Sequence, residues 1–226
     1  SGRRLIIDNL KQEAAWNYGA SLSFTFPINN KLLKLNTEYY YTHFISQTLV
    51  DYDTNPQELH ITNLNGKSFS HTFQVDASYE LFKGLDLTAA YRYNLVKATY
   101  NNRLMWKPLQ SRYKALLTAS YKTPLGLWQF DDTLALNGGG RMPEPYTSPV
   151  TGNLSWERTY KAYGQVNAQI TRHFRHFSIY VGGENLTNFK QKNPIIGYDN
   201  PWSNTFEPTM VYGPIQGAMA YVGLRL

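Results

Sequence analysis

Residues 69–94 have the sequence FSHTFQVDASYELFKGLDLTAAYRYN, in which two alternating runs flank a short reversal. From Phe69 to Leu81, every second residue is apolar or aromatic except His71. After the reversal, the alternation resumes from Leu85 to Tyr93. A period of two places successive side chains on opposite faces of a β-strand. The stretch therefore predicts two antiparallel strands joined by a turn at FKGLD.

The same alternation recurs along nearly the whole chain. Asp132 breaks the apolar face of the run that contains it, and no segment has the pattern of a convincing helix. The further runs cover residues 16–26, 33–41, 113–121, 128–136, 160–170, 177–184 and 217–226. The sequence therefore predicts an all-β, antiparallel fold of about nine strands.

The connections between these runs are short and long in alternation. The short ones are PINN, FKG, TPLG and RHFRH. The long ones cover residues 51–66, 101–110, 138–156 and 190–214. Outer-membrane barrels have short periplasmic turns and longer extracellular loops. The connections therefore favour a transmembrane barrel with the long segments outside the cell.

A soluble β-sandwich or lipocalin-like barrel would also alternate. Two features favour the membrane: the runs reach about 10 to 15 residues where five or six is usual, and aromatic residues gather at the ends of the apolar faces. Examples are Trp16 with Phe26, Tyr113 with Tyr121, and Tyr160. Such residues form the girdles at the two membrane interfaces. The polar set, too large for a dry core, would face a watery or plugged lumen.

Composition excludes several classes of site and partner. The chain has no cysteine, which excludes a disulfide scaffold, thiolate metal sites and cysteine nucleophiles. The mean hydropathy of -0.46 is compatible with a barrel, because only every second residue of a strand faces lipid. The formal charge is +6, but the 22 Lys and Arg form no long basic run. We therefore expect no nucleic-acid partner, and expect contacts with outer-membrane lipid and lipopolysaccharide instead.

The last third of the chain carries more specific motifs. These are GGGRMPEPY at 138–146, FSIYVGGENLTNFKQKNP at 177–194 and GPIQGAMAYVGLRL at 213–226. They resemble the C-terminal part of TonB-dependent outer-membrane receptors, in the style of Bacteroidetes receptors. The resemblance extends loosely over all 226 residues and is specific from about residue 137 onward.

This resemblance implies a multi-pass barrel of the cell outer membrane with about 22 strands around a plug. About nine strands cannot close such a barrel, so residues 1–226 would be its C-terminal part. We expect the plug and the N-terminal strands on another chain, and the TonB complex as a partner through that plug. A surface lipoprotein is a further candidate partner. The start, SGRRLIIDNL, lacks an apolar signal-peptide core and would lie in an extracellular loop.

The final run would be the closing strand of the barrel. Ala218, Val222 and Leu224 would face lipid, and Tyr221 and Arg225 would face the lumen. One neighbour would be the strand at 177–184, and the other would be the first strand of the receptor. The family commonly ends on an aromatic residue, whereas this sequence ends on Leu226.

Flat rings and guanidinium groups recur on the expected extracellular segments. Such residues stack on planar ligands, hold sugars or clamp anionic groups, although they also anchor in headgroups or pack loop against loop. The candidate ligand-binding residues are Arg103, Trp106, Arg141, Tyr146, Tyr198, Trp202, Phe206 and Tyr212, with Met105 and Met142 beside them.

Catalytic and metal-binding patterns are weak. His173 and His176 are three residues apart, but they lie in a short turn beside two arginines. Asp131 and Asp132 would point to opposite faces of a strand. The glycines at 138–140 lack the strand, helix and lysine of a phosphate-binding loop, and would instead let a strand bend or a ligand approach the backbone. We expect no enzyme, no resident metal and no cofactor.

The resemblance thus implies an active-transport receptor that binds a scarce ligand and imports it with energy delivered by TonB. By the resemblance, the ligand is a metal chelate such as a siderophore, haem or cobalamin. An oligosaccharide is the second candidate. The rival classes are a passive outer-membrane porin and a soluble β binding module.

Overall fold

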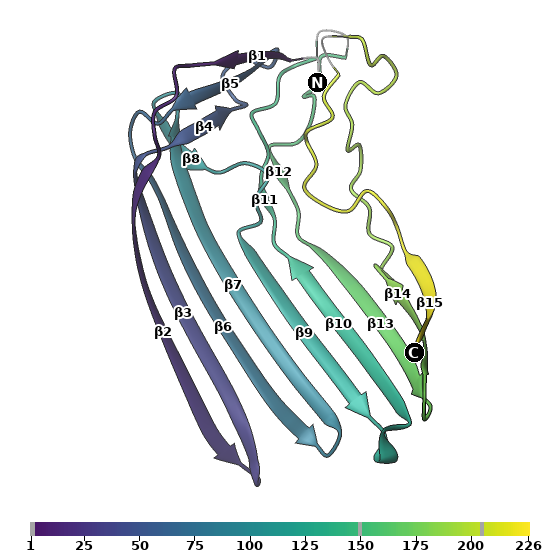
Figure 1. Ribbon diagram of the computed structural model, residues 1–226. Coiled ribbons are helices and arrows are strands. Elements are labelled where there is room, and N and C mark those ends of the chain that lie inside the picture. Colours follow the sequence, from purple (N-terminus) through teal and green to yellow (C-terminus); the bar gives the residue numbers. More distant parts are fainter. Residues whose placement is uncertain (1–2, 149–150, 204–205) are drawn as a thin grey trace.

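One curved antiparallel sheet dominates the computed structural model, which describes residues 3–148, 151–203 and 206–226 (Figure 1). Its strand order is β15-β14-β13-β10-β9-β7-β6-β3-β2, with β8 on the free length of β7. The strands of this path are β2 (Ala14–Ile28), β3 (Lys31–Ser46), β6 (Ser68–Phe82), β7 (Leu85–Tyr100), β9 (Tyr113–Lys122), β10 (Trp128–Asn137), β13 (Tyr163–His173), β14 (Ser178–Glu184) and β15 (Met219–Arg225). The prediction of an all-β, antiparallel fold with about nine main strands is confirmed.

The hairpin at residues 69–94 forms as expected. β6 and β7 pair from Ser68 opposite Ala98 down to Phe82 opposite Leu85. Gly84 makes the reversal with a φ of +95°, which an L side chain rarely adopts. The β2–β3 hairpin closes through Asn29 and Asn30, whose φ angles of 50° and 62° are those of a type I′ turn. Local turn chemistry therefore sets both registers.

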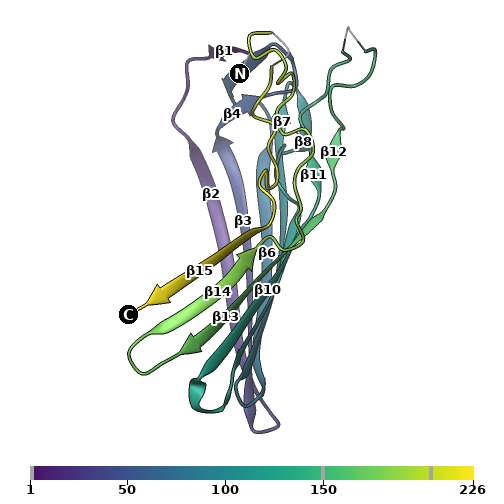
Figure 2. The same cartoon turned by 90° about the vertical axis from the view of Figure 1, so that its right-hand side faces the viewer.

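The sheet presents a convex and a concave face (Figure 2). Ser68, Ser70 and Thr72 line a cavity together with residues of the loops above them, so the polar set faces the concave side. The alternate residues, Phe69, His71 and Phe73, therefore face the convex side. The concave side is the polar lumen wall that the alternation predicts.

Strand register arranges the convex side chains in cross-strand rows. The row nearest the long loops, here called the upper row, consists of Trp16, His43, Phe69, Lys97 and Trp106. Two rows below it come Ala20, Tyr39, Phe73, Tyr93 and Tyr113. Near the short turns, a lower aromatic row contains Tyr121 and Phe130. Aromatic side chains thus concentrate at two levels of the convex face, as the girdle prediction requires.

Mostly small and aliphatic side chains occupy the convex face between these levels, with Phe24 and Tyr91 among them. Leu22 is 60% exposed and Leu134 is 48% exposed, with no protein layer over them. Asp132 also points outward, because its register partners Ala119 and Ala168 belong to this face. The break in the apolar pattern is therefore a real outward-facing carboxylate on an otherwise regular strand.

The sheet remains open in the described residues. There β15 pairs only with β14, and β2 pairs only with β3. In β15, Val222 and Leu224 are 76% and 59% exposed, whereas the hydroxyl of Tyr221 donates to the side chain of Gln169 on the concave face. The expected orientation of the final strand is therefore correct.

The long segments carry short strands that the sequence pattern did not predict. β1 (Arg4–Ile7) pairs in parallel with β5 (Glu58–Asn63), which pairs with β4 (Thr48–Asp51). β8 (Arg103–Trp106) extends the β7 hairpin, and β11 (Gly140–Arg141) pairs with β12 (Thr159–Tyr160). All lie at the end opposite the short turns (Figure 1).

The buried apolar residues also gather at the long-loop end. One cluster contains Leu49, Ala98 and Tyr100, and the other contains Met142, Tyr160 and Met210. The expectation that Tyr160 belongs to an outer girdle is wrong, because Tyr160 is 5% exposed and β13 begins only at Tyr163. The chain leaves the sheet between β12 and β13, so the alternating pattern does not carry through.

No helix in the described part of the chain is long and apolar enough to cross a membrane.

Candidate functional site

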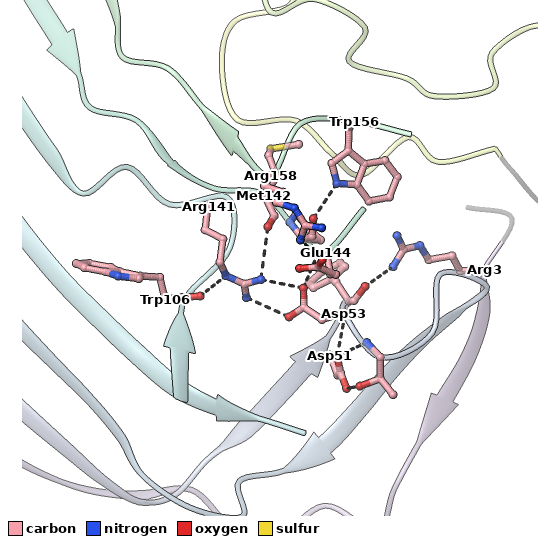
Figure 3. A network of polar contacts seen from close by, with 12 residues as sticks. Arg3, Asp51, Asp53, Trp106, Arg141, Met142, Glu144, Trp156 and Arg158 are labelled. Atoms are coloured by element: carbon pink, nitrogen blue, oxygen red, sulfur yellow. Dashed lines mark hydrogen bonds and ion pairs between the residues drawn. The ribbon is translucent and has the colours of Figure 1, made fainter. Parts of the chain in front are cut away.

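A guanidinium–carboxylate network ties the long segments together (Figure 3). Arg141 pairs with both oxygens of Asp53, with Nη1 at 2.8 Å from Oδ1 and Nη2 at 3.1 Å from Oδ2. Its Nε donates to the carbonyl of Trp106 at 2.7 Å. The backbone N–H of Glu144 donates to the same Asp53 carboxylate. The side chains of Arg141 and Asp53 are only 14% and 9% exposed, so this network fixes three segments relative to one another.

A local turn presents Asp53 to this network. Asp51 Oδ1 accepts the backbone N–H of Asp53 at 2.8 Å and that of Thr54 at 3.1 Å. An Asp that accepts hydrogen bonds from the two or three residues after it makes a tight turn without strand or helix. The sequence DYDT at 51–54 therefore encodes the position of the Asp53 carboxylate.

A buried ion pair joins Arg3, directly before β1, to the last long loop. Arg3 pairs with Glu207, and their side chains are 3% and 4% exposed. Arg3 Nη1 also donates to the carbonyl of Tyr52 at 3.2 Å. Burial, and then the charge of Glu207, raise the pKa of the Tyr52 phenol. The phenol therefore stays neutral beside the pair.

Stacked aromatic rings lie next to these ion pairs. Tyr160 and Tyr212 stack with ring centroids 4.1 Å apart and planes at 10°. Burial raises the pKa of Tyr160, and a 3.4 Å hydrogen-bond contact with Ser111 partly offsets this. Both rings pack with the buried Met142 and Met210. The cluster forms an aromatic wall.

Two cavities open at this end of the molecule. The first, here called the rim cavity, has a volume of about 510 Å³ and lies between the concave face and the loops. Its floor is polar, with Ser70, Thr72 and Asn94, and its walls are formed by Leu49, Tyr52 and Tyr100. It is a mixed surface without concentrated charge.

The second cavity, here called the cap cavity, has a volume of about 480 Å³. Its lining includes the aromatic residues Trp156, Tyr160, Phe189 and Tyr212 and the charged residues Lys161, Lys190, Lys192 and Glu157. The charged residues of this lining are thus three lysines and one glutamate. This volume falls in the range of small-molecule sites, and its charge favours an anionic ligand with flat apolar parts.

The eight residues predicted as ligand contacts fall into three groups. Arg141, Tyr146 and Tyr212 are part of the loop scaffold: Arg141 holds Asp53, Tyr146 meets Trp156 edge to face, and Tyr212 stacks on Tyr160. Among these three, only Tyr212 also lines the cap cavity. Most N–H groups of Arg141 are used within the protein, so its place in the structure is that of a scaffold residue.

The second group consists of Tyr198, Trp202 and Phe206 on the last long loop. Tyr198 is 73% exposed and Trp202 is 95% exposed, whereas Phe206 is half-buried. The third group is Arg103 and Trp106 on β8; Arg103 is exposed, and Trp106 lies beneath two cations. The structure therefore does not gather the eight residues into one site.

Sequence reasoning missed most of the cap cavity. Lys161, Lys190 and Lys192 carry its charge, and Trp156 and Phe189 carry much of its wall. The run FKQK at 189–192 was the available signal, because it places two lysines and a ring beside each other. The inward position of Tyr160 could not be predicted, because this residue continues the alternating pattern of the run that follows it.

The glycines at 138–140 were expected to let a strand bend or a ligand approach the backbone, and the structure instead places other parts of this protein against them. A side chain on Gly139 would meet the carbonyl of Tyr160, and one on Gly140 would meet the carbonyl of Gln110. The approaching groups belong to this protein, so the glycines serve the packing of β11 against its neighbours.

The described residues contain no group of three or more His, Cys, Asp or Glu side chains placed to hold a metal ion. His173 is the last residue of β13 and pairs with Ser178 of β14, and its Nδ1 is 3.1 Å from the Ser178 hydroxyl. Asp131 points to the concave face and accepts from Ser120, away from Asp132. The two aspartates therefore lie on opposite faces, as predicted.

Similarity to known proteins agrees with this architecture. The family model described as TonB dependent receptor-like, beta-barrel, matches residues 1–186. A comparison with curated protein sequences finds no match.

Solved structures of outer-membrane transporters have the same fold. The copper transporter OprC aligns with a TM-score of 0.68 and 16% identity, over 96% of this chain and 32% of that one. The FrpB iron transporter from Neisseria meningitidis gives 0.60 and 14%, over 98% and 32%. A ferric enterobactin receptor, PfeA, from Pseudomonas aeruginosa gives 0.60 and 14%, over 95% and 31%.

The chain thus spans about a third of the length of the solved structures that it matches. The family match covers most of the sequence and excludes the soluble β module, because barrels of this family lie in the outer membrane. This chain belongs to the family of TonB-dependent receptor β-barrels of the outer membrane.

Proposed function

We propose that the chain is the C-terminal part of an outer-membrane receptor that captures a metal chelate and imports it with TonB-derived energy. The observation that carries this proposal is the cap cavity, with its aromatic wall and its three lysines. No covalent chemistry is needed for this task. The protein has to bind, hold and release its ligand.

The cavity favours an anionic metal chelate over a neutral sugar. Many metal chelators are acidic and partly planar, so a chelate offers negative charge to Lys161, Lys190 and Lys192 and flat surface to Trp156 and Tyr212. A neutral oligosaccharide would stack on the same rings but would leave the ammonium groups without a counter-charge. Haem and carboxylate or catecholate siderophores match best, and cobalamin matches less well because it lacks several acidic groups.

The similar proteins point in the same direction. Three of them are described as an iron transporter, a copper transporter and a ferric enterobactin receptor. Another is described as bound to heterologous pyoverdines with iron. Since identities are at or below 16%, they support the class of ligand and not its identity.

The remaining parts of the receptor would complete the machine. The concave face, with polar rows such as Gln74, Arg92, Lys114 and Asn137, would support a plug that rearranges when TonB pulls on it. Each solved chain is about three times as long as the part shared with this segment, which favours a single polypeptide over the separate chain expected from the sequence. The Bacteroidetes type and a partner lipoprotein remain predictions.

Ligand binding to the complete receptor in detergent tests the proposal. The panel consists of haemin, a ferric catecholate, a ferric hydroxamate, cyanocobalamin and a maltooligosaccharide, measured by tryptophan fluorescence quenching. The double variant K190Q/K192Q should weaken binding of an anionic chelate about tenfold, from two lost charge contacts. Lys83→Gln, in the short turn after β6, is the matched control and should leave affinity unchanged.

Two results would reject the chelate assignment. One is preferential binding of the oligosaccharide, and the other is an equal loss of chelate affinity in K190Q/K192Q and in the control Lys83→Gln. The porin alternative has its own readout. A passive pore would conduct ions steadily in planar bilayers without TonB, whereas a plugged receptor should stay closed and should import its ligand only in cells with an energised TonB complex.

A further inference from the structure

Two cations lie over one indole on the lipid-facing side of the barrel wall. The ring centroid of Trp106 is 4.3 Å from the guanidinium carbon of Arg112 and 5.3 Å from Nζ of Lys97. Lys97 faces the convex side, because its neighbours Val96 and Ala98 line the concave rim cavity. Trp106 is its register partner on β8 and shares that face.

The rest of the upper row is aromatic. Phe69 is the register partner of Lys97 on β6, followed by His43 and Trp16. In the row below, Tyr41 and His71 have ring centroids 4.7 Å apart. Tyr18, Tyr39, Tyr41, Phe69 and His71 line an open hollow of about 470 Å³. An amphipathic aromatic surface therefore adjoins the two cations on the same convex face.

Strand geometry gives the depth of this surface. Lys97 and Leu85 both face outward on β7, and Leu85 pairs with Tyr121 of the lower aromatic row. Twelve residues separate them, which is about 40 Å along a strand and about 30 Å in height at the usual barrel tilt. The apolar band of such barrels is about 25 Å tall. Lys97 therefore lies at headgroup level when the lower row sits at the opposite interface, and the Arg112 guanidinium lies beside it, over the Trp106 ring that pairs with Lys97.

The charge at this level is not neutralised by the protein. None of the ion pairs between described residues includes Lys97 or Arg112. The carboxylates of the nearby network are already paired, Asp53 with Arg141 and Glu144 with Arg158. Two positive charges beside a ring cluster thus face the outer leaflet, because the long loops mark the extracellular end.

We propose that Lys97, Arg112 and Trp106 form a binding site for a phosphorylated glycolipid headgroup of the outer leaflet. The two cations bind phosphate oxygens, and Trp106 and Phe69 support the sugar rings and the first carbons of the acyl chains. Charge complementarity selects this occupant, since a zwitterionic headgroup offers no net charge to the pair. The site depends on the outer-membrane location and is independent of the ligand that the receptor imports.

Lipid retention by the complete receptor in detergent tests the site, with native mass spectrometry as the readout. The probes are lipid A with two phosphates and lipid A from which the phosphates have been removed. The wild type should retain the phosphorylated form preferentially. K97Q/R112Q should bind it about 10- to 30-fold more weakly, from the loss of two basic contacts at the surface.

Arg172→Gln provides a matched control, because Arg172 lies 5.0 Å from the Trp128 ring at the opposite end of the wall. This variant should retain lipid A like the wild type. If the double variant fails to fold, as judged by its unfolding temperature, R112Q alone should show about a fivefold loss.

Equal retention of both lipid A forms by the wild type would overturn the proposal. So would an unchanged affinity in the folded K97Q/R112Q variant. A second copy of the protein bound in place of lipid, and lost in that variant, would show that the surface is a protein contact and would likewise overturn it.

Discussion

The two ends of the barrel wall are built in different ways. At the short-turn end, each reversal is closed by residues next to one another, such as Asn29 with Asn30, or by Gly84. At the long-loop end, the contacts join distant parts of the chain: Arg141 reaches Asp53 across 88 positions, and Arg3 reaches Glu207. The turn end can therefore form hairpin by hairpin, whereas the loop end forms only when most of the segment is in place.

This difference bears on the function proposed above. A turn that is closed by adjacent residues has one conformation, so a bound ligand would not rearrange it. An end held by a few long-range ion pairs and stacked rings can be reshaped by exchanging contacts, and both cavities lie there. Mutations should separate the two ends.

The largest expected effect comes from Asp53→Ala. The change removes the carboxylate partner of the Arg141 guanidinium, whose side chain is only 14% exposed. The free energy of opening the loop end should therefore fall by about 2 to 4 kcal/mol. Hydrogen exchange of the complete receptor should speed up at residues 139–147 and 155–160. The control Glu157→Gln should not change it. Faster exchange at the short turns as well would show that the two ends are not independent.

Gly140→Ala should have a smaller effect at the same end. A methyl group there would meet the carbonyl of Gln110 and the ring of Tyr160, so β11 must shift away from its neighbours at a cost of about 1 to 3 kcal/mol. Gly164→Ala is the matched control, because its added carbon would be 3.7 Å from the nearest atom. Protease cleavage within residues 139–158 should increase for the first variant only. Equal cleavage of the two would contradict this account of the glycines.

Asn30→Ala tests the turn end. Asn30 has a φ of 62°, and an alanine in this left-handed conformation should destabilise the turn by about 1 kcal/mol or slightly more. Exchange should increase at Asn29 to Lys31 and stay unchanged around Asp53. Asn30→Gly should restore wild-type exchange, because glycine accepts this conformation. A change that spread into the cap cavity would contradict the local origin of the turns.

The smallest effect is a pH response near β1. The pKa of Asp8 lies below its usual 3.8, chiefly because of the hydrogen bond with His60, with Thr62 adding to it. A lowered folded pKa means that the contact stabilises β1 above the usual pKa, and that this stabilisation is lost as the pH falls through the folded value. Exchange of residues 4–7 should therefore rise below about pH 4. His60→Gln should already be faster at neutral pH and should respond less to acid; an identical response would remove the assigned cause.

Period-two patterning predicted the wall, and the reason is physical. One face of each strand meets lipid and the other meets a polar lumen, so the environment imposes the alternation on every residue from Phe69 to Leu81. The turns at Asn–Asn and Lys–Gly could also be predicted, because these residues adopt turn conformations through local backbone preferences.

The loop end could be predicted only in part. The aromatic and basic composition indicated ligand contact, but nothing local shows that Arg141 is engaged by Asp53 or that Tyr160 turns inward onto Tyr212. β5 pairs with β1 across more than fifty positions, a contact that no short pattern encodes. The three lysines of the cap cavity converge from two segments, so their common site appears only in three dimensions.

The single-layered wall has one more consequence. Its convex side chains, such as Leu22 and Val222, have no protein partner in the described residues, so the hydrocarbon of the membrane acts as the missing half of the core. The loop end carries its own buried clusters. The thickness and stiffness of the surrounding medium should therefore set the order of the wall, while the long-loop end keeps its shape in any medium that preserves its ion pairs.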